Sequence, residues 1–299
     1  MPPLSFLLAH LSDPHIGPLP RPAARELIGK RLTGYWNWHH SRHAIHNMDV
    51  LTTLMRDVAA CTPDHIALSG DLVNLGMEAE FALAARLVLP LATPEAMSIV
   101  PGNHDAYVPR SLDHMARTFS PFMTGDDGHF GFPYLRQRGD VALIGLSSAI
   151  PTLPFLASGA LGHAQMAAFE AMLAHARRHA VATVIMIHHP PFRGGSRLFR
   201  GLRDARALEA VLTRHGADLI LHGHNHKRSL HHLTGPGGQR IPVVGVASAS
   251  AVPGDPAHRA AYHLFDITPR KDGAEITLSV RGMETAAAPV TELDRLRIT

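Results

Sequence analysis

Five short segments of this chain combine aspartate, asparagine or histidine with glycine or proline, and nearly all of them directly follow an apolar run. The segments are Asp13-Pro14-His15, Gly70-Asp71-Leu72-Val73-Asn74, Gly102-Asn103-His104-Asp105, His188-His189-Pro190-Pro191 and Gly223-His224-Asn225-His226. The apolar runs indicate buried strands. Ligands of open α/β sheets gather where loops leave the carboxyl ends of the strands. We therefore expect the five segments to converge on one point.

The apolar runs alternate with helical patterns over most of the chain. The expected strands are Leu4–Leu11, His65–Leu68, Met97–Val100, Val141–Leu146, Val181–Ile187, Asp218–Leu221, Ile241–Val246, Tyr262–Ile267 and Ile276–Val280. The expected helices, each with apolar residues at helical spacing, are His43–Ala60, Glu78–Leu89, His163–His179 and Arg206–His215. This alternation predicts an α/β fold with helices on the outer face of a sheet, and the strand-rich last third predicts a second sheet packed on the first.

Composition narrows the class of protein. Of the 299 residues 45% are apolar and 18% are charged, as in an ordinary globular protein with an ample core. A net charge of +3 is slight for this length and argues against nucleic acid as the partner. The single cysteine, Cys61, excludes an internal disulfide and a thiolate metal site. The opening apolar run lacks a basic flank and a cleavage site, so we expect a cytoplasmic protein.

The side chains of the five segments indicate a metal centre. Oxygen and imidazole ligands without thiolates suit Zn, Mn, Fe, Ni or Co. Enough of them are present to hold two ions with a carboxylate shared between the ions. Because adjacent metal pairs recur in enzymes that carry out in-line displacement at phosphorus, the sequence predicts hydrolysis of phosphate esters.

The order of the segments resembles that of the calcineurin-like metallophosphoesterases, whose pattern is D-x-H, G-D-x-x-N or D, G-N-H-D or E, a lone His, and G-H-x-H. Every part of the pattern is present, over roughly Leu4 to Ile267. The resemblance implies a four-layer α/β/β/α sandwich of two mixed sheets flanked by helices, in a single domain of residues 1–299. It also implies a divalent-metal-dependent phosphoesterase in which a metal-bridging hydroxide attacks phosphorus in line.

The resemblance further implies roles for individual residues. The expected ligands of two divalent ions (Mn, Fe, Zn or Ni) are Asp13, His15, Asp71, Asn103, His188, His224 and His226. The first ion would take Asp13, His15 and His226. The second would take Asn103, His188 and His224, and Asp71 would bridge the two. The expected catalytic pair is His104, as proton or hydrogen-bond donor to the leaving oxygen, and Asp105, which would orient its ring and raise its pKa.

The segment from Thr33 to His46 is not explained by the family pattern. It contains both tryptophans, Trp36 and Trp38, next to His39, and it follows a basic stretch. One interpretation is a helix packed beside the sheet. The other is a cap insertion, at about residues 18–46, that contacts the non-phosphate part of the substrate through stacking or lipid contacts.

A glycine-rich stretch after His188 holds several arginines. Arginine binds phosphate oxygens in a bidentate manner, so we expect Arg193, Arg197 and Arg200 to be candidates for substrate binding. The alternative is a solvated loop that leads into the next helix.

Several functions remain open from the sequence. A phosphodiesterase acting on a small-molecule phosphate ester or diester is favoured over a monoesterase. One alternative is a pyrophosphohydrolase of the UDP-2,3-diacylglucosamine type of lipid A synthesis, with the tryptophan-bearing segment as a lipid-facing cap and peripheral membrane contact. A different class of answer is a catalytically inactive binding scaffold with the same fold. The oligomeric state is open.

Overall fold

The first of two sheets carries the N-terminus of the chain. The computed structural model describes residues 5–252, 254–270 and 273–299, so Leu4 of the first expected strand lies outside the described residues. The strand order is β12-β11-β10-β1-β2-β3. The strands are β1 (Phe6–Leu11), β2 (His65–Leu68), β3 (Met97–Ile99), β10 (Ala261–Arg270), β11 (Gly273–Met283) and β12 (Val290–Arg297). β1, β2 and β3 are parallel, and β10 to β12 extend the sheet in antiparallel fashion.

The second sheet has the order β4-β5-β6-β7-β9-β8. Its strands are β4 (Tyr134–Arg138), β5 (Val141–Gly145), β6 (Ala182–Met186), β7 (Leu219–His222), β8 (Ser229–Thr234) and β9 (Arg240–Gly245). The four central strands are parallel, and the two edge strands β4 and β8 are antiparallel to their neighbours. Both sheets are therefore mixed.

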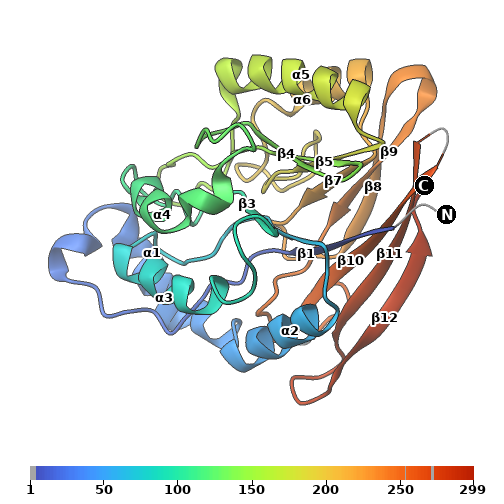
Figure 1. Cartoon of the computed structure of the whole chain (residues 1–299). Coiled ribbons are helices and arrows are strands. Elements are labelled where there is room, and N and C mark those ends of the chain that lie inside the picture. Colours follow the sequence, from blue (N-terminus) through green and yellow to red (C-terminus); the bar gives the residue numbers. More distant parts are fainter. Residues whose placement is uncertain (1–4, 253, 271–272) are drawn as a thin grey trace.

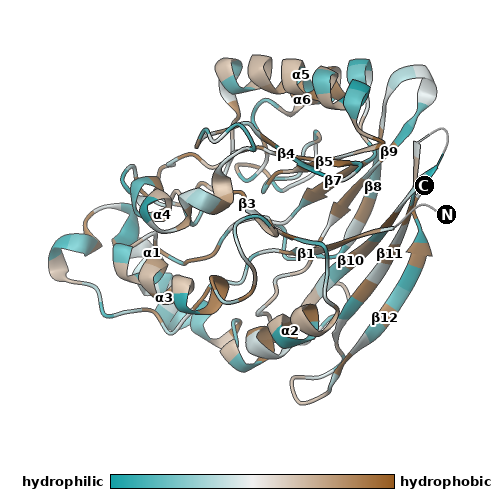
Figure 2. Cartoon of the chain, in the orientation of Figure 1, coloured by the Kyte–Doolittle hydropathy of each residue, from teal (hydrophilic) through white to brown (hydrophobic). Residues whose placement is uncertain are grey.

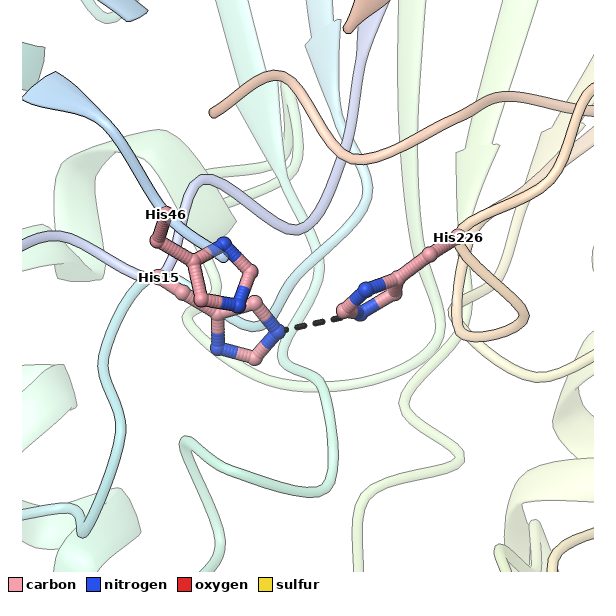
Figure 3. A group of neighbouring side chains, drawn as sticks. All are labelled: His15, His46 and His226. Carbon is pink, nitrogen blue, oxygen red and sulfur yellow. Dashed lines mark hydrogen bonds between the residues drawn. The ribbon is translucent and has the colours of Figure 1, made fainter. Parts of the chain in front are cut away.

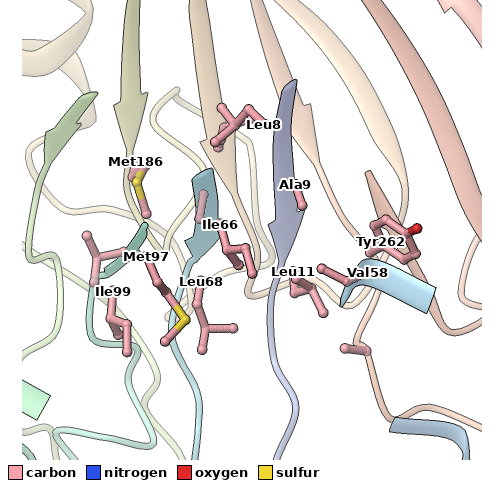
Figure 4. Close-up of a cluster of buried hydrophobic side chains, with 14 of the residues drawn as sticks. Leu8, Ala9, Leu11, Val58, Ile66, Leu68, Met97, Ile99, Met186 and Tyr262 are labelled. Atoms are coloured by element: carbon pink, nitrogen blue, oxygen red, sulfur yellow. The ribbon is translucent and has the colours of Figure 1, made fainter. Parts of the chain in front are cut away.

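The two sheets pack face to face on one apolar core. Leu8 and Ile66 of the first sheet belong to the same buried cluster as Met186 and Leu221 of the second. Figure 4 shows Met186 beside the side chains of β1 and β2. A second cluster joins Ile185 of β6 to the helices outside the second sheet. The central strands are buried on both sides, which explains why they read as continuous apolar runs.

Helices cover the outer faces of both sheets (Figure 1). α2 (Met48–Ala60), α3 (Glu78–Val88) and α4 (Ser111–Phe119) contribute to the core of the first sheet. α5 (Gly162–His179) and α6 (Ala205–His215) lie on the second sheet. The predicted α/β fold of two mixed sheets flanked by helices is confirmed.

A further helix, α1 (Lys30–His40), lies at the end of the molecule away from both chain termini (Figure 1). Short 3₁₀ turns flank it at Ala24–Leu27 and Arg42–Ala44, and others lie at Ser120–Met123 and Pro236–Gly238. None of the residues of α1 is buried. In the part of the chain that the structure describes, no helix is both long enough and apolar enough to span a bilayer.

Every expected strand is present, with shifts of a few residues at its ends. The structure also contains three strands and one helix, α4, that the sequence analysis did not predict. The three strands β4, β8 and β12 all lie at sheet edges. Their sequences alternate or mix polar and apolar residues, as Figure 2 shows for the partly hydrophilic β8 and β12. The helix expected at His43–Ala60 begins only at Met48, where the Asn47 side chain accepts hydrogen bonds from the first amides.

Candidate metal centre

The glycines of the metal-binding segments let the loops approach one another closely. A Cβ atom on Gly223 would lie 1.9 Å from Ser12 Oγ and 2.3 Å from Asp13 Oδ2. A Cβ atom on Gly102 would lie 2.2 Å from Asp71 Oδ1. All three distances are far below van der Waals contact, so only glycine allows these loops to converge.

The backbone of the site is strained at the residues expected to bind metal. Five of the seven expected ligands have positive φ angles, between 39° and 67°: Asp13, His15, Asp71, His224 and His226. Such conformations are uncommon for residues other than glycine and persist only where the surrounding structure holds them. In this backbone conformation the five side chains point inward from the ends of β1, β2 and β7.

Four of the expected ligands form one tight group. Ligand atoms of Asp13, His15, Asp71 and His226 all lie within 4.8 Å of one another. His226 Nε2 is 3.1 Å from His15 Nε2, as Figure 3 shows, and 3.2 Å from Asp13 Oδ1. Donor atoms about 3 Å apart are what ligands of a common ion require when each bond is about 2.0–2.2 Å. Asp13 Oδ1 is buried and accepts no hydrogen bond from any residue that the structure describes, so this group fits a cation.

The remaining expected ligands form a second group beside the first. His188 Nε2 lies 3.3 Å from Asn103 Oδ1, and His224 Nδ1 lies 2.8 Å from the same oxygen. His188 Nδ1 is 2.7 Å from the Ser69 carbonyl, so Nδ1 carries the proton and Nε2 is free to bind a metal. This arrangement also fits a cation.

Asp71 lies between the two groups. Its Oδ2 atom is 3.7 Å from His15 Nε2 in the first group and 3.4 Å from His188 Nε2 in the second. Burial alone would lower the pKa of His188, but the Asp71 carboxylate outweighs burial and raises the pKa to about 9. The structure thus brings all seven expected ligands together around one buried carboxylate.

The contacts of Asp105 show that its expected role, to orient the His104 ring, is wrong. Its carboxylate accepts hydrogen bonds from the backbone amides of Asp71 (2.8 Å), Leu72 (2.9 Å) and Gly102 (2.8 Å), and none of its described contacts reaches the His104 ring. Asp105 therefore ties the loop after β2 to the loop after β3. It positions Asp71 and Asn103 instead of orienting a catalytic histidine.

His104 is held by other groups. Its Nδ1 lies 2.6 Å from the Asn74 carbonyl, which places the proton on Nδ1, and Arg42 Nη1 donates to its Nε2 at 2.7 Å. Burial lowers the pKa of His104 and the Arg42 charge lowers it further, to about 3. The expected rise in pKa is therefore wrong, because burial and the Arg42 cation outweigh the Asp71 carboxylate, which alone would raise the pKa.

Arg42 and His46 lie at the site but are not among the site residues expected from the sequence. Arg42 Nη2 lies 3.2 Å from His15 Nε2. The His46 ring packs on His15 with 4.5 Å between centroids (Figure 3), and its Nε2 is buried without a partner. Both lie in or directly after the 3₁₀ turn that follows α1, within the segment that the family pattern left unexplained. The only sequence signal for these two residues was that the family pattern left their segment unexplained.

Two cavities meet at the metal centre. A polar one of about 640 Å³ is lined by Arg197 and Arg200 as well as by ligand residues. Arg193 lies outside both cavities and is paired with Glu209, with 2.9 Å between Nε and Oε2, so it does not fit the expected binding role.

The second cavity, of about 930 Å³, is lined by Trp36 and Trp38 and also by Arg42 and Arg200. His39 packs against the Tyr35 and Trp38 rings and is not among the described residues that line either cavity. The expected placement beside the site therefore holds for the tryptophans and not for His39.

The sequence and the fold define the class of protein. Residues 6–228 match the model of the calcineurin-like phosphoesterases, so the chain belongs to this family. It is 25% identical over 237 residues to the glycerophosphodiester phosphodiesterase GpdQ of Enterobacter lignolyticus, covering 75% of this chain and 72% of that protein. Together with the buried cluster of histidine and aspartate, this makes the chain a metal-dependent phosphoesterase.

Solved structures share the fold over nearly the whole chain. A dimetal phosphatase from Danio rerio superimposes with a TM-score of 0.65 at 14% identity, covering 98% of each chain. A purple acid phosphatase from yellow lupin superimposes with a TM-score of 0.63 at 13% identity, and covers 99% of this chain but only 54% of its own.

Proposed function

We propose that this protein is a phosphodiesterase that uses two divalent ions, with Asp71 bridging them. The observation that carries the proposal is the position of Asp71 Oδ2 within 3.7 Å of His15 Nε2 and 3.4 Å of His188 Nε2. Asp13, His15 and His226 would bind the first ion, and Asn103, His188 and His224 the second. When bound, such a pair supplies a water of lowered pKa and neutralises charge on the phosphate.

The residues around the proposed ions are suited to orient an anionic phosphate. Arg42 and Arg200 line both cavities and Arg197 lines the polar one. Arginine forks hold phosphate oxygens in fixed directions, so the phosphate is placed with its leaving group on the side of His104. The segment 18–46 acts as a cap, because it supplies Arg42 and one wall of the larger cavity.

His104 lines both cavities and is the residue we assign to the leaving oxygen. Without substrate, its Nε2 accepts a hydrogen bond from Arg42, and burial together with the Arg42 charge lowers the pKa of the ring and keeps it neutral. A phosphate anion attracts the Arg42 guanidinium to itself and adds negative charge beside the ring. Both changes raise the proton affinity of His104 Nε2, so that it can take up a proton from solvent and pass that proton to the leaving oxygen.

A diester is favoured over a monoester because two cavities flank the centre. A diester carries two substituents on phosphorus, and the cavities of about 930 and 640 Å³ give each substituent its own space. The phosphodiesterase from Enterobacter lignolyticus is consistent with the same preference.

The test compares two chromogenic substrates. The protein is loaded with Mn, Zn, Fe(II) or Ni, and kcat/KM is measured for bis(p-nitrophenyl) phosphate and for p-nitrophenyl phosphate. We expect the diester to be the better substrate with at least one metal. A faster monoester would contradict the diester preference. Background rates for both substrates with every metal would favour the scaffold.

A second candidate is a pyrophosphohydrolase that acts on UDP-2,3-diacylglucosamine or a similar lipid-linked nucleotide. The mainly apolar lining of the larger cavity is the observation that favours it. Release of a nucleoside monophosphate from that compound, at a rate above that for bis(p-nitrophenyl) phosphate, would make it the better assignment.

A further inference from the structure

The larger cavity has a mainly apolar wall that the chemistry at phosphorus does not require. Six of its apolar and aromatic lining residues come from α1, from the turn after it and from a loop before α5: Leu32, Trp36, Trp38, Ile45, Phe155 and Leu156. Several of these side chains are exposed, among them Trp36 (63%) and Phe155 (89%). Large apolar groups gathered at the mouth of a site indicate that the natural ligand covers them.

Two polar groups of the wall beside α1, those of Lys30 and Thr33, are already engaged by the protein. Lys30 Nζ donates to Thr152 Oγ1 at 2.7 Å and to the Leu156 carbonyl at 3.3 Å. Thr33 Oγ1 donates to the Lys30 carbonyl at 2.9 Å. A nucleobase or a sugar needs free donors and acceptors to be bound specifically. An alkyl chain needs only apolar surface, and this is what the wall offers.

Charge at one end of the cavity fixes how such a ligand would lie. Arg42 and Arg200 line both the apolar and the polar cavity, so they stand where the two meet. An anionic phosphate bound there would lie beside Asn103 and His104, which also line both cavities. A chain attached to that phosphate would run along α1.

The wall is held in place although α1 has no buried residue. Arg31 Nε donates to the Leu75 carbonyl at 3.0 Å, and Arg31 Nη2 donates to the Gly76 carbonyl at 2.7 Å. A Cβ atom on Gly34 would lie 2.1 Å from Tyr107 Oη, so glycine lets α1 lie directly on that ring. The wall of the cavity is thus fixed by contacts between α1 and the rest of the fold.

We propose that this cavity binds the long alkyl or acyl chain of a phosphoester substrate, with the phosphate at Arg42 and Arg200. The proposal rests on the proposed function for the phosphoester part of the ligand. It names the substrate class as esters with one apolar substituent of many carbons.

The experiment measures binding without turnover. Both tryptophans of the protein line the cavity, so intrinsic fluorescence reports its occupant directly. Zinc-loaded protein is titrated with methyl-, butyl- and octylphosphonate. We expect dissociation constants to fall about twofold to fourfold for each methylene that is buried, with a blue shift of the emission. Equal constants for the three phosphonates would overturn the proposal.

A variant pair locates the effect. Leu32→Ser should reduce the ratio between the butyl and octyl constants at least threefold. Leu230→Ser is the matched control, because Leu230 is an exposed leucine on β8 that lies outside the cavity lining, and it should leave the ratio unchanged. Equal reductions in both variants would contradict the location. A change of oligomeric state in Leu32→Ser, with chain-length-independent binding, would identify a second copy of the chain as the occupant.

Kinetics separate this proposal from the one on which it rests. If alkyl p-nitrophenyl phosphodiesters are not hydrolysed but octylphosphonate binds tightly, the phosphodiesterase assignment fails and the apolar pocket stands. If methyl and octyl esters are hydrolysed with equal kcat/KM, the assignment stands and the pocket fails.

Discussion

The two halves of the site are built in different ways. The metal-binding half comes from loops at the ends of buried strands, and its backbone is fixed by bonds such as those from three amides to the Asp105 carboxylate. The apolar half comes from α1, which has no buried residue, and from a loop with a side chain as exposed as Phe155. The proposed reaction is thus placed on a frame of buried strands, and the proposed choice of substrate on exposed side chains.

The largest expected effect is on the rigid half. Asp71→Asn removes the charge between the two groups of ligands. We expect kcat/KM for bis(p-nitrophenyl) phosphate to fall about 10³-fold or more, because a metal pair contributes several kcal/mol at the reacting phosphorus. Elemental analysis should give fewer ions per chain than in the parent. Asp113→Asn, at an exposed position on α4, is the control and should match the parent. Parent activity in Asp71→Asn would remove the bridging role.

The variant His104→Ala tests a residue that lies where the metal-binding half and the apolar half of the site meet. We expect both ions to remain bound, while kcat falls about 10²- to 10⁴-fold, as is typical when a general acid is lost. The control is His163→Ala, an exposed histidine in the first turn of α5. Turnover at the parent rate would show that the leaving oxygen takes its proton from elsewhere.

Arg42 lies between the proposed cap and the ring of His104, and its loss should act in two ways. Arg42→Ala should raise KM about tenfold, through loss of a charged contact to phosphate. It should also raise the pKa of His104 from about 3, because the cation beside the ring is removed. Titration of the ring by NMR measures this shift in the zinc-loaded protein. An unchanged pKa would mean that the Arg42 charge does not contribute to it.

The smallest expected effect lies in the frame away from the site. Asp57 on α2 accepts hydrogen bonds from Tyr262 (2.6 Å) and from Arg281 (2.8 Å). Burial raises the pKa of Asp57, but these two hydrogen bonds outweigh it and hold the pKa below 3.8. The ion pair therefore stabilises the fold at pH values above 3.8. Its contribution is lost as the pH falls through the lowered pKa of Asp57.

Asp57→Asn should lower the free energy of unfolding by about 1–3 kcal/mol at pH 7. Urea unfolding from pH 7 down to pH 3 measures the difference, which should narrow at low pH, while kcat stays at the parent value. Asp140→Asn, at an exposed turn before β5, controls for loss of a carboxylate. A difference that does not depend on pH would argue against the ion pair as its cause.

The central strands and the converging segments could be predicted from the sequence, because burial on both sides leaves a continuous apolar run. The edge strand β12 could not, since one face meets solvent and its sequence mixes charged with apolar residues. The helix α1 could be placed only as one of two interpretations, because its apolar residues serve a cavity and not a core.

The expected ligands were identifiable because each is anchored to a strand end by a short motif. Roles that depend on contacts across the fold were not. Asp105 follows His104 in sequence, yet its carboxylate turns to the amides of another loop. Arg42 contacts the His104 ring although the two residues are 62 positions apart, and no local sequence pattern predicts such a contact.

Anomalous diffraction from manganese-soaked crystals tests the central claim most directly. Two peaks about 3.5–4 Å apart, one on each side of the Asp71 carboxylate, are the predicted result. A single peak, or two peaks that do not share Asp71, would contradict the account.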